Sequence, residues 1–430
     1  MSPKSHSQKP NKSCERFGVA RAWRWGQKRL SLGKVRRGRV VGHNQILQSM
    51  RGIAAMVVVY GHATYLVPME ANAAFRMEIL LFQAKTAVVF FFVLSGFVLG
   101  QSVRRLQCDG SPLWFARYVV IRLARLVPIF WLSTLVGAAV AIISSRYRLA
   151  DMGAWYYAVA TTSAPTWAQV IEAIAKLEAS FNGDLWSIRV EYWMMAILPP
   201  MVILSRKIPV WADAIVILAG CALARIVVYQ SLYEPTESAA VTCWAYCFYV
   251  GVALPKIIAS LGKYRWVFCS GASAMISLTL MVYLMMKSHG MEAWGNTLIL
   301  DGLLSASLIA WAQATTGSIG AKVLSWRPLV VLGDMSYSVY AYGQALLIPT
   351  TIVVVSMLPH SMRTEPRGGA LLTLLCPTVS LVILLPMSWL SYVYVKQKAT
   401  RLGRRTSLAI SSLLPGGIPT PSAMRSVPPS

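Results

Sequence analysis

Apolar residues occur in runs of about twenty, separated by short polar connections, over most of this chain. A helix of that length crosses the roughly 30 Å hydrocarbon core of a bilayer. The alternating ten-residue strands of a membrane barrel are absent from the pattern. We therefore predict an all-α membrane protein, a polytopic bundle of about ten transmembrane helices. They are expected at residues 46–67, 79–101, 122–143, 186–205, 209–230, 240–260, 266–286, 296–315, 328–357 and 370–395, the last two tilted or broken at Pro349 and Pro377.

The composition agrees with a membrane protein. Of the 430 residues, 56% are hydrophobic and only 13% are charged. A soluble protein of this size carries roughly 25% charged residues. The seven cysteines form no CxxC pair, so we expect small core residues and neither disulfides nor metal ligands.

The formal net charge of +25 would suit a nucleic-acid partner, but its distribution along the chain favours a membrane. Lysine and arginine gather in the N-terminal tail, in every second connection and in the C-terminal tail. The intervening connections carry acidic residues. This alternation follows the positive-inside rule and predicts that both termini are cytoplasmic, as in a multi-pass protein of the cell inner membrane. We expect no nucleic-acid partner.

Three segments are predicted from this pattern. Residues 1–44 form a basic N-terminal tail that we expect to be disordered, and no cleavable signal peptide is visible in it. Residues 45–395 form the transmembrane domain. Residues 396–430 form a basic and then Pro/Ser-rich tail, whose end we also expect to be disordered.

Charged side chains inside membrane helices are costly, so each one is a candidate for function. Arg51 and His62 lie eleven residues apart in the first predicted helix. That spacing puts them on one face, separated by about 16 Å along the axis. The predicted topology places Arg51 near the cytoplasmic surface and His62 in the outer half. A snorkelling arginine and a structural histidine would give the same pattern.

The fourth predicted helix opens with DLWSIRVEYW. Ser187 and Glu191 are four residues apart and share a face. Counting from the outer end places Glu191 at a depth similar to that of His62. A neutral histidine beside a carboxylate is the usual arrangement of a general base with its orienting group. An ion pair that only holds two helices together is the alternative.

Five further charged residues fall at definite depths. Arg225 and Asp301 are expected in the outer half, where they would line a polar cavity for an acceptor or neutralise one another. On the inner side, Arg122 and Arg125 follow Arg117 at the start of the third helix. With Arg51, they would bind a multiply phosphorylated ligand from the cytoplasm. Ordinary anchoring by positive charge is the other explanation, and it suits Arg117 best.

Five stretches of the sequence resemble the motifs of membrane-bound acyltransferase family 3. These stretches are MRGIAAMVVVYGHA at 50–63, VVFFFVLSGFVLG at 88–100, RYVVIRLARLVPIFW at 117–131, LWSIRVEYW at 185–193 and LGDMSYSVYAYGQ at 332–344. Together they span nearly the whole bundle and occur in the family's order. The family contains acetyltransferases of O-antigens, exopolysaccharides and nodulation factors.

The resemblance implies an acyltransferase that uses acetyl-CoA as a substrate and holds no permanent cofactor. It implies that His62 is catalytic and that Arg51 is tied to the acyl donor. From the residues themselves, we also expect Glu191 to orient His62 and Arg122 and Arg125 to bind the phosphates of the acyl-CoA together with Arg51. Trp186 and Ser187 of the fourth motif are then expected to contact the acceptor, a saccharide or glycolipid. Polysaccharide-biosynthesis machinery would be a partner.

One motif departs from the family pattern. The late motif commonly continues Tyr-Leu-x-His, whereas this chain has Tyr340-Ala341-Tyr342-Gly343, so the second histidine is missing. A non-catalytic scaffold would explain that loss, but Arg51, His62 and Glu191 are intact. A transporter or flippase for a lipid-linked sugar is the rival function, although the sequence shows none of the inverted repeats that many transporters have.

The alternating charges generate a prediction about topology. Reporter fusions at positions 110 and 264 should give a cytoplasmic signal, and a fusion at position 235 should give an external one. A cytoplasmic signal at position 235 would overturn the depths inferred for His62 and Glu191.

Overall fold

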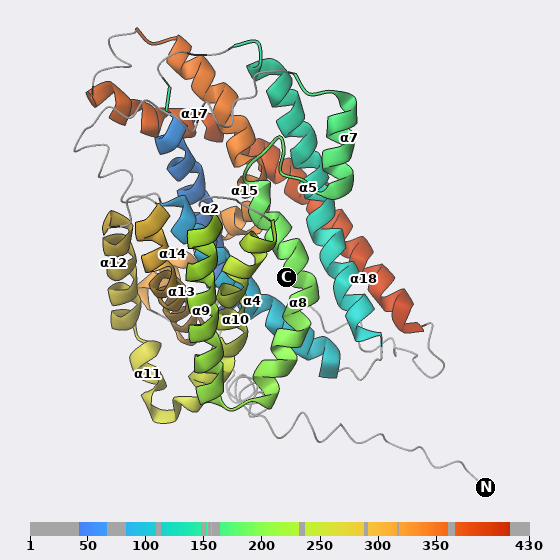
Figure 1. Cartoon of the computed structure of the whole chain (residues 1–430), viewed down its shortest axis with the longest axis vertical. Coiled ribbons are helices and arrows are strands. Elements are labelled where there is room, and N and C mark those ends of the chain that lie inside the picture. The colour runs from blue at the N-terminus through green and yellow to red at the C-terminus, as the bar shows by residue number, and fades with distance from the viewer. Residues whose placement is uncertain are drawn as a thin grey trace, which may run out of the picture.

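The computed structural model describes residues 43–66, 83–108, 113–147, 164–231, 237–287, 291–315, 318–359 and 366–412, with 149, 152, 153 and 156. In this part of the chain the regular elements are all helices (Figure 1). They are α2 (His43–Leu66), α4 (Ala84–Cys108), α5 (Trp114–Ser144), α7 (Trp167–Lys176), α8 (Leu185–Lys207), α9 (Val210–Ser231), α10 (Glu237–Ser260), a 3₁₀ turn (Gly262–Tyr264), α11 (Arg265–Phe268), α12 (Gly271–Lys287), α13 (Met291–Ala314), α14 (Ile319–Leu324), α15 (Arg327–Ser356), α17 (Pro366–Ser391), a π-helical turn (Tyr392–Lys396) and α18 (Gln397–Ser412).

The all-α architecture is confirmed, and a helix occupies each of the ten predicted positions. Within the described residues, seven helices are long and apolar enough to cross a membrane by themselves. A bent pair, the segment 262–268 with 271–284, would add an eighth. The total of about ten spans and the orientation of the termini remain predictions. The expected breaks at Pro349 and Pro377 do not occur, since α15 and α17 each run through their proline as one helix.

Helix α15 lies at the centre of the bundle. Every residue from Met335 to Ile348 is buried, so this stretch has no face toward lipid or solvent. A helix buried on all sides is typical of the core of a large helical protein. Helices α2, α5 and α17 pack around it. Side chains on different faces of α15 can therefore contribute to polar contacts with several helices.

Close backbone crossings hold two pairs of helices together. Where α4 meets α10, a Cβ added at Gly96 would lie 2.1 Å from the carbonyl oxygen of Phe248, and one at Gly251 would lie 2.0 Å from that of Val93. Where α2 meets α15, a Cβ at Gly333 would lie 1.9 Å from the carbonyl oxygen of Gln48. Only glycine permits such contact, and small residues at helix interfaces are typical of membrane bundles.

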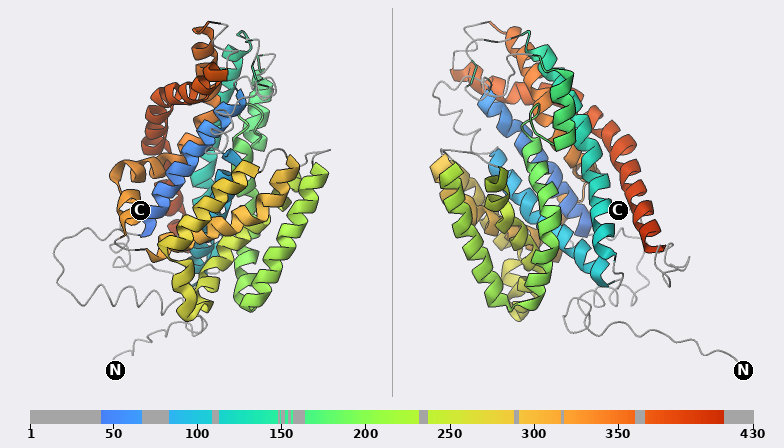
Figure 2. Two further views of the ribbon diagram at one scale, coloured as in Figure 1. Left: turned by 90° about the vertical axis from the view of Figure 1, so that its left-hand side faces the viewer. Right: turned by 45° about the vertical axis from the view of Figure 1, so that its right-hand side comes forward.

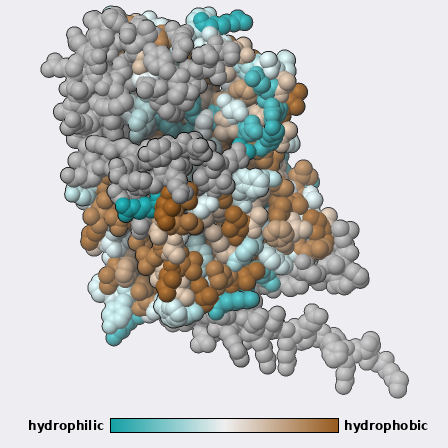
Figure 3. All heavy atoms as spheres, in the orientation of Figure 1, coloured by the Kyte–Doolittle hydropathy of each residue, from teal (hydrophilic) through white to brown (hydrophobic). Residues whose placement is uncertain are grey.

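The outward faces of several helices are apolar. On α9 the side chains of Trp211, Ile215, Leu218 and Ile226 are all more than half exposed. Brown, hydrophobic residues cover much of the surface formed by the helices in the lower half of Figure 3. A water-soluble helix would turn such residues inward, so these faces are suited to lipid.

The basic segment after residue 395 is not an extended tail at its start. The π-helical turn at Tyr392–Lys396 joins α17 to α18, which continues to Ser412. Helix α18 runs beside α5, as Figure 1 and the right view of Figure 2 show. At the contact, a Cβ on Gly403 would lie 2.5 Å from the Cβ of Ala124. The rest of the predicted tails, 1–42 and 413–430, lies outside the described residues.

The crossing at Gly96 generates a prediction about stability. Gly96→Ala should lower stability by about 1–3 kcal/mol through overpacking, although alanine favours a helix more than glycine does. The matched control is Gly271→Ala in α12, because an added Cβ there has no neighbour within 4 Å. Thermal unfolding of the detergent-solubilised variants measures both effects. Equal melting temperatures for the two variants would contradict the close crossing.

Candidate active site

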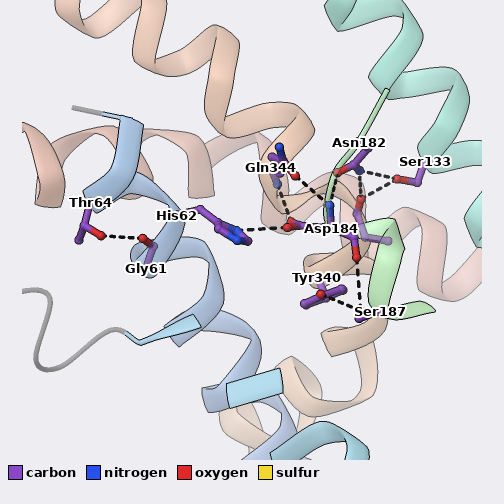
Figure 4. Close-up of polar contacts among 10 residues, drawn as sticks. Gly61, His62, Thr64, Ser133, Asn182, Asp184, Ser187, Tyr340 and Gln344 are labelled. Carbon is purple, nitrogen blue, oxygen red and sulfur yellow. Dashed lines mark hydrogen bonds and ion pairs between the residues drawn. The ribbon is translucent and has the colours of Figure 1, made fainter. Parts of the chain in front are cut away.

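His62 of α2 faces a buried carboxylate at the start of α8. Its Nδ1 lies 3.2 Å from Oδ1 of Asp184, and the two side chains are 17% and 2% exposed (Figure 4). The histidine is therefore partly accessible, while its acidic partner is enclosed. This pair and the residues that hold it, Ser133, Asn182, Ser187, Tyr340 and Gln344, are called the His62 cluster below.

Asp184 is fixed on both sides by Gln344 of α15. The Gln344 backbone N–H donates to Asp184 Oδ2 at 3.1 Å, and the Asp184 backbone N–H donates to Gln344 Oε1 at 2.8 Å. Gly183 allows this approach, because a Cβ there would lie 2.8 Å from Gln344 Oε1. One bond holds the carboxylate through Oδ2 and the other holds the backbone of Asp184, while Oδ1 faces His62.

The loop that carries Asp184 is also tied to α5 and α15. The Asn182 side chain donates to Ser133 Oγ at 2.9 Å and to the Ala341 carbonyl at 2.5 Å. Ser133 Oγ donates to the same carbonyl at 2.6 Å. These buried bonds connect three elements that are far apart in the sequence. The carboxylate facing His62 is thus held in place before any substrate arrives.

A pair of hydroxyl groups lies one turn further along α8. Ser187 Oγ donates to the Tyr340 hydroxyl at 2.7 Å, and Figure 4 shows both side chains near the first turn of α8. Because the tyrosine oxygen accepts this bond, its own O–H can donate to another group. Tyr340 also contacts the ring of Phe91 edge-on, with centroids 5.8 Å apart.

The expected pairing of His62 with Glu191 is not what the structure shows. The carboxylate beside His62 belongs to Asp184, and Glu191 lies seven residues later, about two helical turns along α8. Glu191 instead accepts a hydrogen bond of 2.6 Å from Ser95 Oγ of α4. Asp184 and Glu191 lie on the same face of α8, so only their depth in the bundle decides which one meets His62. Counting residues from an approximate helix end could not decide between these two depths.

Glu191 lines a second feature, a hollow that opens to solvent. The space between its side chains and its mouth, solvent included, is about 510 Å³. We call it the arginine hollow. Its lining residues come from α2, α4, α5, α8 and α15: Arg51, Leu94, Ser95, Val98, Leu99, Arg122, Arg125, Leu126, Glu191, Met195 and Tyr337. Each of the five sequence motifs contributes at least one of them. The lining combines apolar side chains from α4, α5 and α8 with polar side chains that are mostly cationic.

The three arginines of the hollow are only partly balanced. Arg51 Nη1 donates to Gln48 Oε1 at 3.3 Å. The buried Arg122 lies over the Tyr118 ring at 5.9 Å, and its Nε has no hydrogen-bond partner within the described part of the chain. Against the three guanidinium groups the lining contains the single carboxylate of Glu191. Buried guanidinium groups with unused donors are suited to a multivalent anion.

The remaining predicted site residues lie apart from the hollow. Trp186 packs against the rings of Phe92 and Trp244, with centroids 6.0 and 5.6 Å away. Asp301 is buried and accepts a 3.3 Å bond from Thr86, while its Oδ1 has no partner among the described residues. Arg225 is exposed on α9, and no ion pair joins it to Asp301 in the described structure.

A comparison with protein families identifies the chain. A family model described as an acyltransferase domain, Acyl_transf_3, matches residues 44–393, which is most of the chain. This chain belongs to acyltransferase family 3. No curated protein and no solved structure matches it. The match covers both the His62 cluster and the arginine hollow.

The family assignment gives the geometry a chemical meaning, because the protein is a membrane acyltransferase. Its His–Asp pair has the arrangement of a general base with an orienting carboxylate. Sequence reasoning singled out His62 and the arginines as candidates, and it did not single out Asp184, Asn182, Gln344 and Ser133, which contact one another beside His62 here. The only signal for Asp184 was an acid directly before the Leu-Trp-Ser motif. The position of the missing late histidine, Gly343, lies close to this carboxylate, since an added Cβ would be 3.6 Å from Asp184 Oδ2.

Proposed function

We propose that this acyltransferase moves an acetyl group from cytoplasmic acetyl-CoA to a hydroxyl of an extracytoplasmic or lipid-linked saccharide. One observation carries the proposal. The same helices provide the arginine hollow, which is suited to an anion, and the His62–Asp184 pair, which is held in position by its neighbours. The family assignment supports the acyl transfer itself. The donor, the acceptor and the location in the inner membrane are parts of the proposal.

The arginine hollow is suited to the phosphates of CoA. Arg51, Arg122 and Arg125 provide forked donors that match phosphate oxygens, and Leu94 and Val98 provide an apolar wall. Arg51 and His62 are separated by about 16 Å along α2. The extended pantetheine arm of CoA has a comparable length. A donor with its phosphates at Arg51 would therefore present its thioester near His62.

The proposed reaction uses His62 as the general base. The acceptor oxygen attacks the thioester carbonyl carbon, the C–O bond forms, and the C–S bond breaks. His62 Nε2 takes the hydroxyl proton and returns it to the leaving sulfur, which gives free CoA. Asp184 stabilises the imidazolium that forms between these steps. We further propose that the Tyr340 hydroxyl donates to the carbonyl oxygen as negative charge develops on it.

The acceptor is proposed to bind beside the His62 cluster. Trp186 offers an aromatic ring at the same end of α8 as Asp184, and Ser187 offers a hydroxyl. The unsatisfied carboxylate oxygen of Asp301 could accept a bond from a sugar hydroxyl. Rings and a few polar groups are the usual means of binding a saccharide. The exposed Arg225 on α9 is proposed to contact the head group of a glycolipid acceptor.

The catalytic assignment predicts a difference between three variants. His62→Ala should reduce turnover by about 10²–10⁴-fold, since a general base is lost. Asp184→Asn should reduce turnover at least about tenfold, with the KM for acetyl-CoA little changed. Glu191→Gln should instead change the KM for acetyl-CoA, because Glu191 lines the arginine hollow together with its three arginines. The measurement is acetylated saccharide formed by membranes with matched amounts of each variant.

Two outcomes would contradict this assignment. His62→Ala acting at the wild-type rate would end the mechanism and favour a transporter of lipid-linked sugars. A loss of turnover in Glu191→Gln but not in Asp184→Asn would restore the pairing expected from the sequence. Acetyl label retained on wild-type protein without acceptor, and absent from His62→Ala, would indicate an acyl-histidine intermediate in place of direct transfer.

The donor assignment is tested separately. Arg122→Ala and Arg125→Ala together should raise the KM for acetyl-CoA far more than that for the acceptor. Each charge-assisted contact to phosphate is worth about 1.5–3 kcal/mol. Arg265→Ala is the matched control, because Arg265 is an exposed arginine outside the hollow. An unchanged KM for acetyl-CoA in the double variant would show that these two arginines serve only as topology anchors.

A further inference from the structure

The junction between α17 and α18 contains an irregularity close to the arginine hollow. Residues Tyr392–Lys396 form one π-helical turn within an otherwise α-helical segment. Such a turn inserts an extra residue and changes the direction of the side chains after it. Single π-helical turns occur frequently at functional sites. Here the last residue of the turn is a lysine.

The side chain of Lys396 points into the protein. The residue is only 9% exposed, and its Nζ donates to the Asp334 carbonyl at 2.6 Å. The ammonium also lies 5.3 Å from the centre of the Tyr392 ring. It is close enough to Arg51 and Arg125 for the three positive charges to interact. A lysine that served only as a membrane anchor would extend toward water.

A chain of hydrogen bonds connects this lysine to the hollow. Arg51 Nη1 donates to Gln48 Oε1 at 3.3 Å, and Gln48 Nε2 donates to Asp334 Oδ1 at 2.9 Å. Lys396 then binds the backbone carbonyl of the same aspartate. Asp334 is thus contacted by groups from α2 and from the π-helical turn. Lys396 belongs to the same polar network as Arg51.

The network has more positive than negative charge. Its cations are the guanidinium groups of the arginine hollow and Lys396, four in all, and its described carboxylates are Glu191 and Asp334. The excess is two positive charges, which is expensive in a poorly solvated place. A ligand group with two negative charges would balance this excess.

We propose that Lys396 is a fourth cationic residue of the arginine hollow, and that the hollow binds the diphosphate of the acyl donor. This proposal rests on the function proposed above and specifies which part of the donor the hollow takes. The diphosphate of CoA carries two negative charges, and one pantetheine arm separates it from the thioester. The charge excess and the distance from Arg51 to His62 therefore both favour the diphosphate of CoA as the ligand group.

Helix α18 has a structural part in this site. It packs along α5, the helix that carries Arg122 and Arg125, and Gly403 permits contact with Ala124. Arg117 Nε donates to Ser407 Oγ at 3.4 Å in the same interface. The segment that supplies Lys396 therefore also braces the helix that supplies two of the arginines.

The experiment compares two lysines two residues apart. Lys396→Gln removes the buried charge, Lys396→Arg keeps it, and Lys398→Gln removes an exposed charge as a control. Each full-length protein is purified in detergent, checked by thermal unfolding, and titrated with CoA by calorimetry. Turnover with acetyl-pantetheine, which lacks phosphates, is measured in parallel.

We expect Lys396→Gln to weaken CoA binding about ten- to hundredfold and to leave turnover of acetyl-pantetheine unchanged. Lys396→Arg should retain most of the affinity, and Lys398→Gln should match the wild type. Unchanged CoA affinity in Lys396→Gln would overturn the proposal. An equal loss with acetyl-pantetheine would also overturn it, since that result indicates a structural role. Wild-type protein without affinity for CoA would instead overturn the donor assignment on which it rests.

A second measurement does not depend on the folding of a variant. Reductive methylation of wild-type protein, followed by mass spectrometry, reports the reactivity of individual lysines. CoA should slow methylation of Lys396 and leave that of Lys398 unchanged. Equal rates at Lys396 with and without CoA would overturn its placement in the site.

Discussion

A guanidinium or carboxylate group at the centre of a membrane helix costs about 2.5–3.5 kcal/mol unless it finds partners or water. The charged residues of this protein that lie inside the bundle are accordingly gathered. Asp213 of α9 receives Lys256 and the Tyr249 hydroxyl, and that lysine also binds the carbonyls of Ser205 and Ile208 at the end of α8. This group is internally balanced and holds α8, α9 and α10 together. The arginine hollow differs because its positive charges outnumber its carboxylates, and this difference separates a structural cluster from a candidate binding site.

Close packing at small residues allows the charged side chains inside the bundle to lie together. Gly96 and Gly251 let α4 and α10 cross with their backbones in contact, and Gly333 does the same for α15 against α2. The glycine of the Ser-Gly-Phe motif thus brings α4 into the core, while the serine beside it binds Glu191. One short motif supplies both the packing and the polar contact. The site depends on the helix crossings as much as on its charged side chains.

Much of the architecture could be predicted from the sequence, because hydrophobic runs of helix length have few alternatives in a bilayer. His62 and the arginines became candidates for a related reason, since a charged or titratable residue within an apolar run is easily recognised in the sequence. Asp184 was missed because it and Glu191 are seven residues apart on one helical face, and only the relative depth of α2 and α8 decides which one meets His62. That depth follows from tilt and packing, which a single sequence does not encode in any local pattern.

The helix that follows residue 396 could not be predicted from the sequence pattern. Its many basic residues and polar composition are typical of a tail, and the pattern contains nothing that predicts a π-helical turn at Tyr392–Lys396. The amphipathic character of α18 becomes meaningful only when α5 is present to cover one of its faces. Gly403, an unremarkable residue in the sequence, is the point of contact.

Helix α15 links the two ends of the site as a rigid spacer. Tyr337 lines the arginine hollow, and Gln344, seven residues later, holds Asp184. Two helical turns, about 10 Å, separate these positions on nearly the same face. The distance between Tyr337 and Gln344 is therefore set by the pitch of the helix. One added residue between them would rotate Gln344 by about 100° away from Asp184, so only an insertion of whole helical turns would keep both contacts.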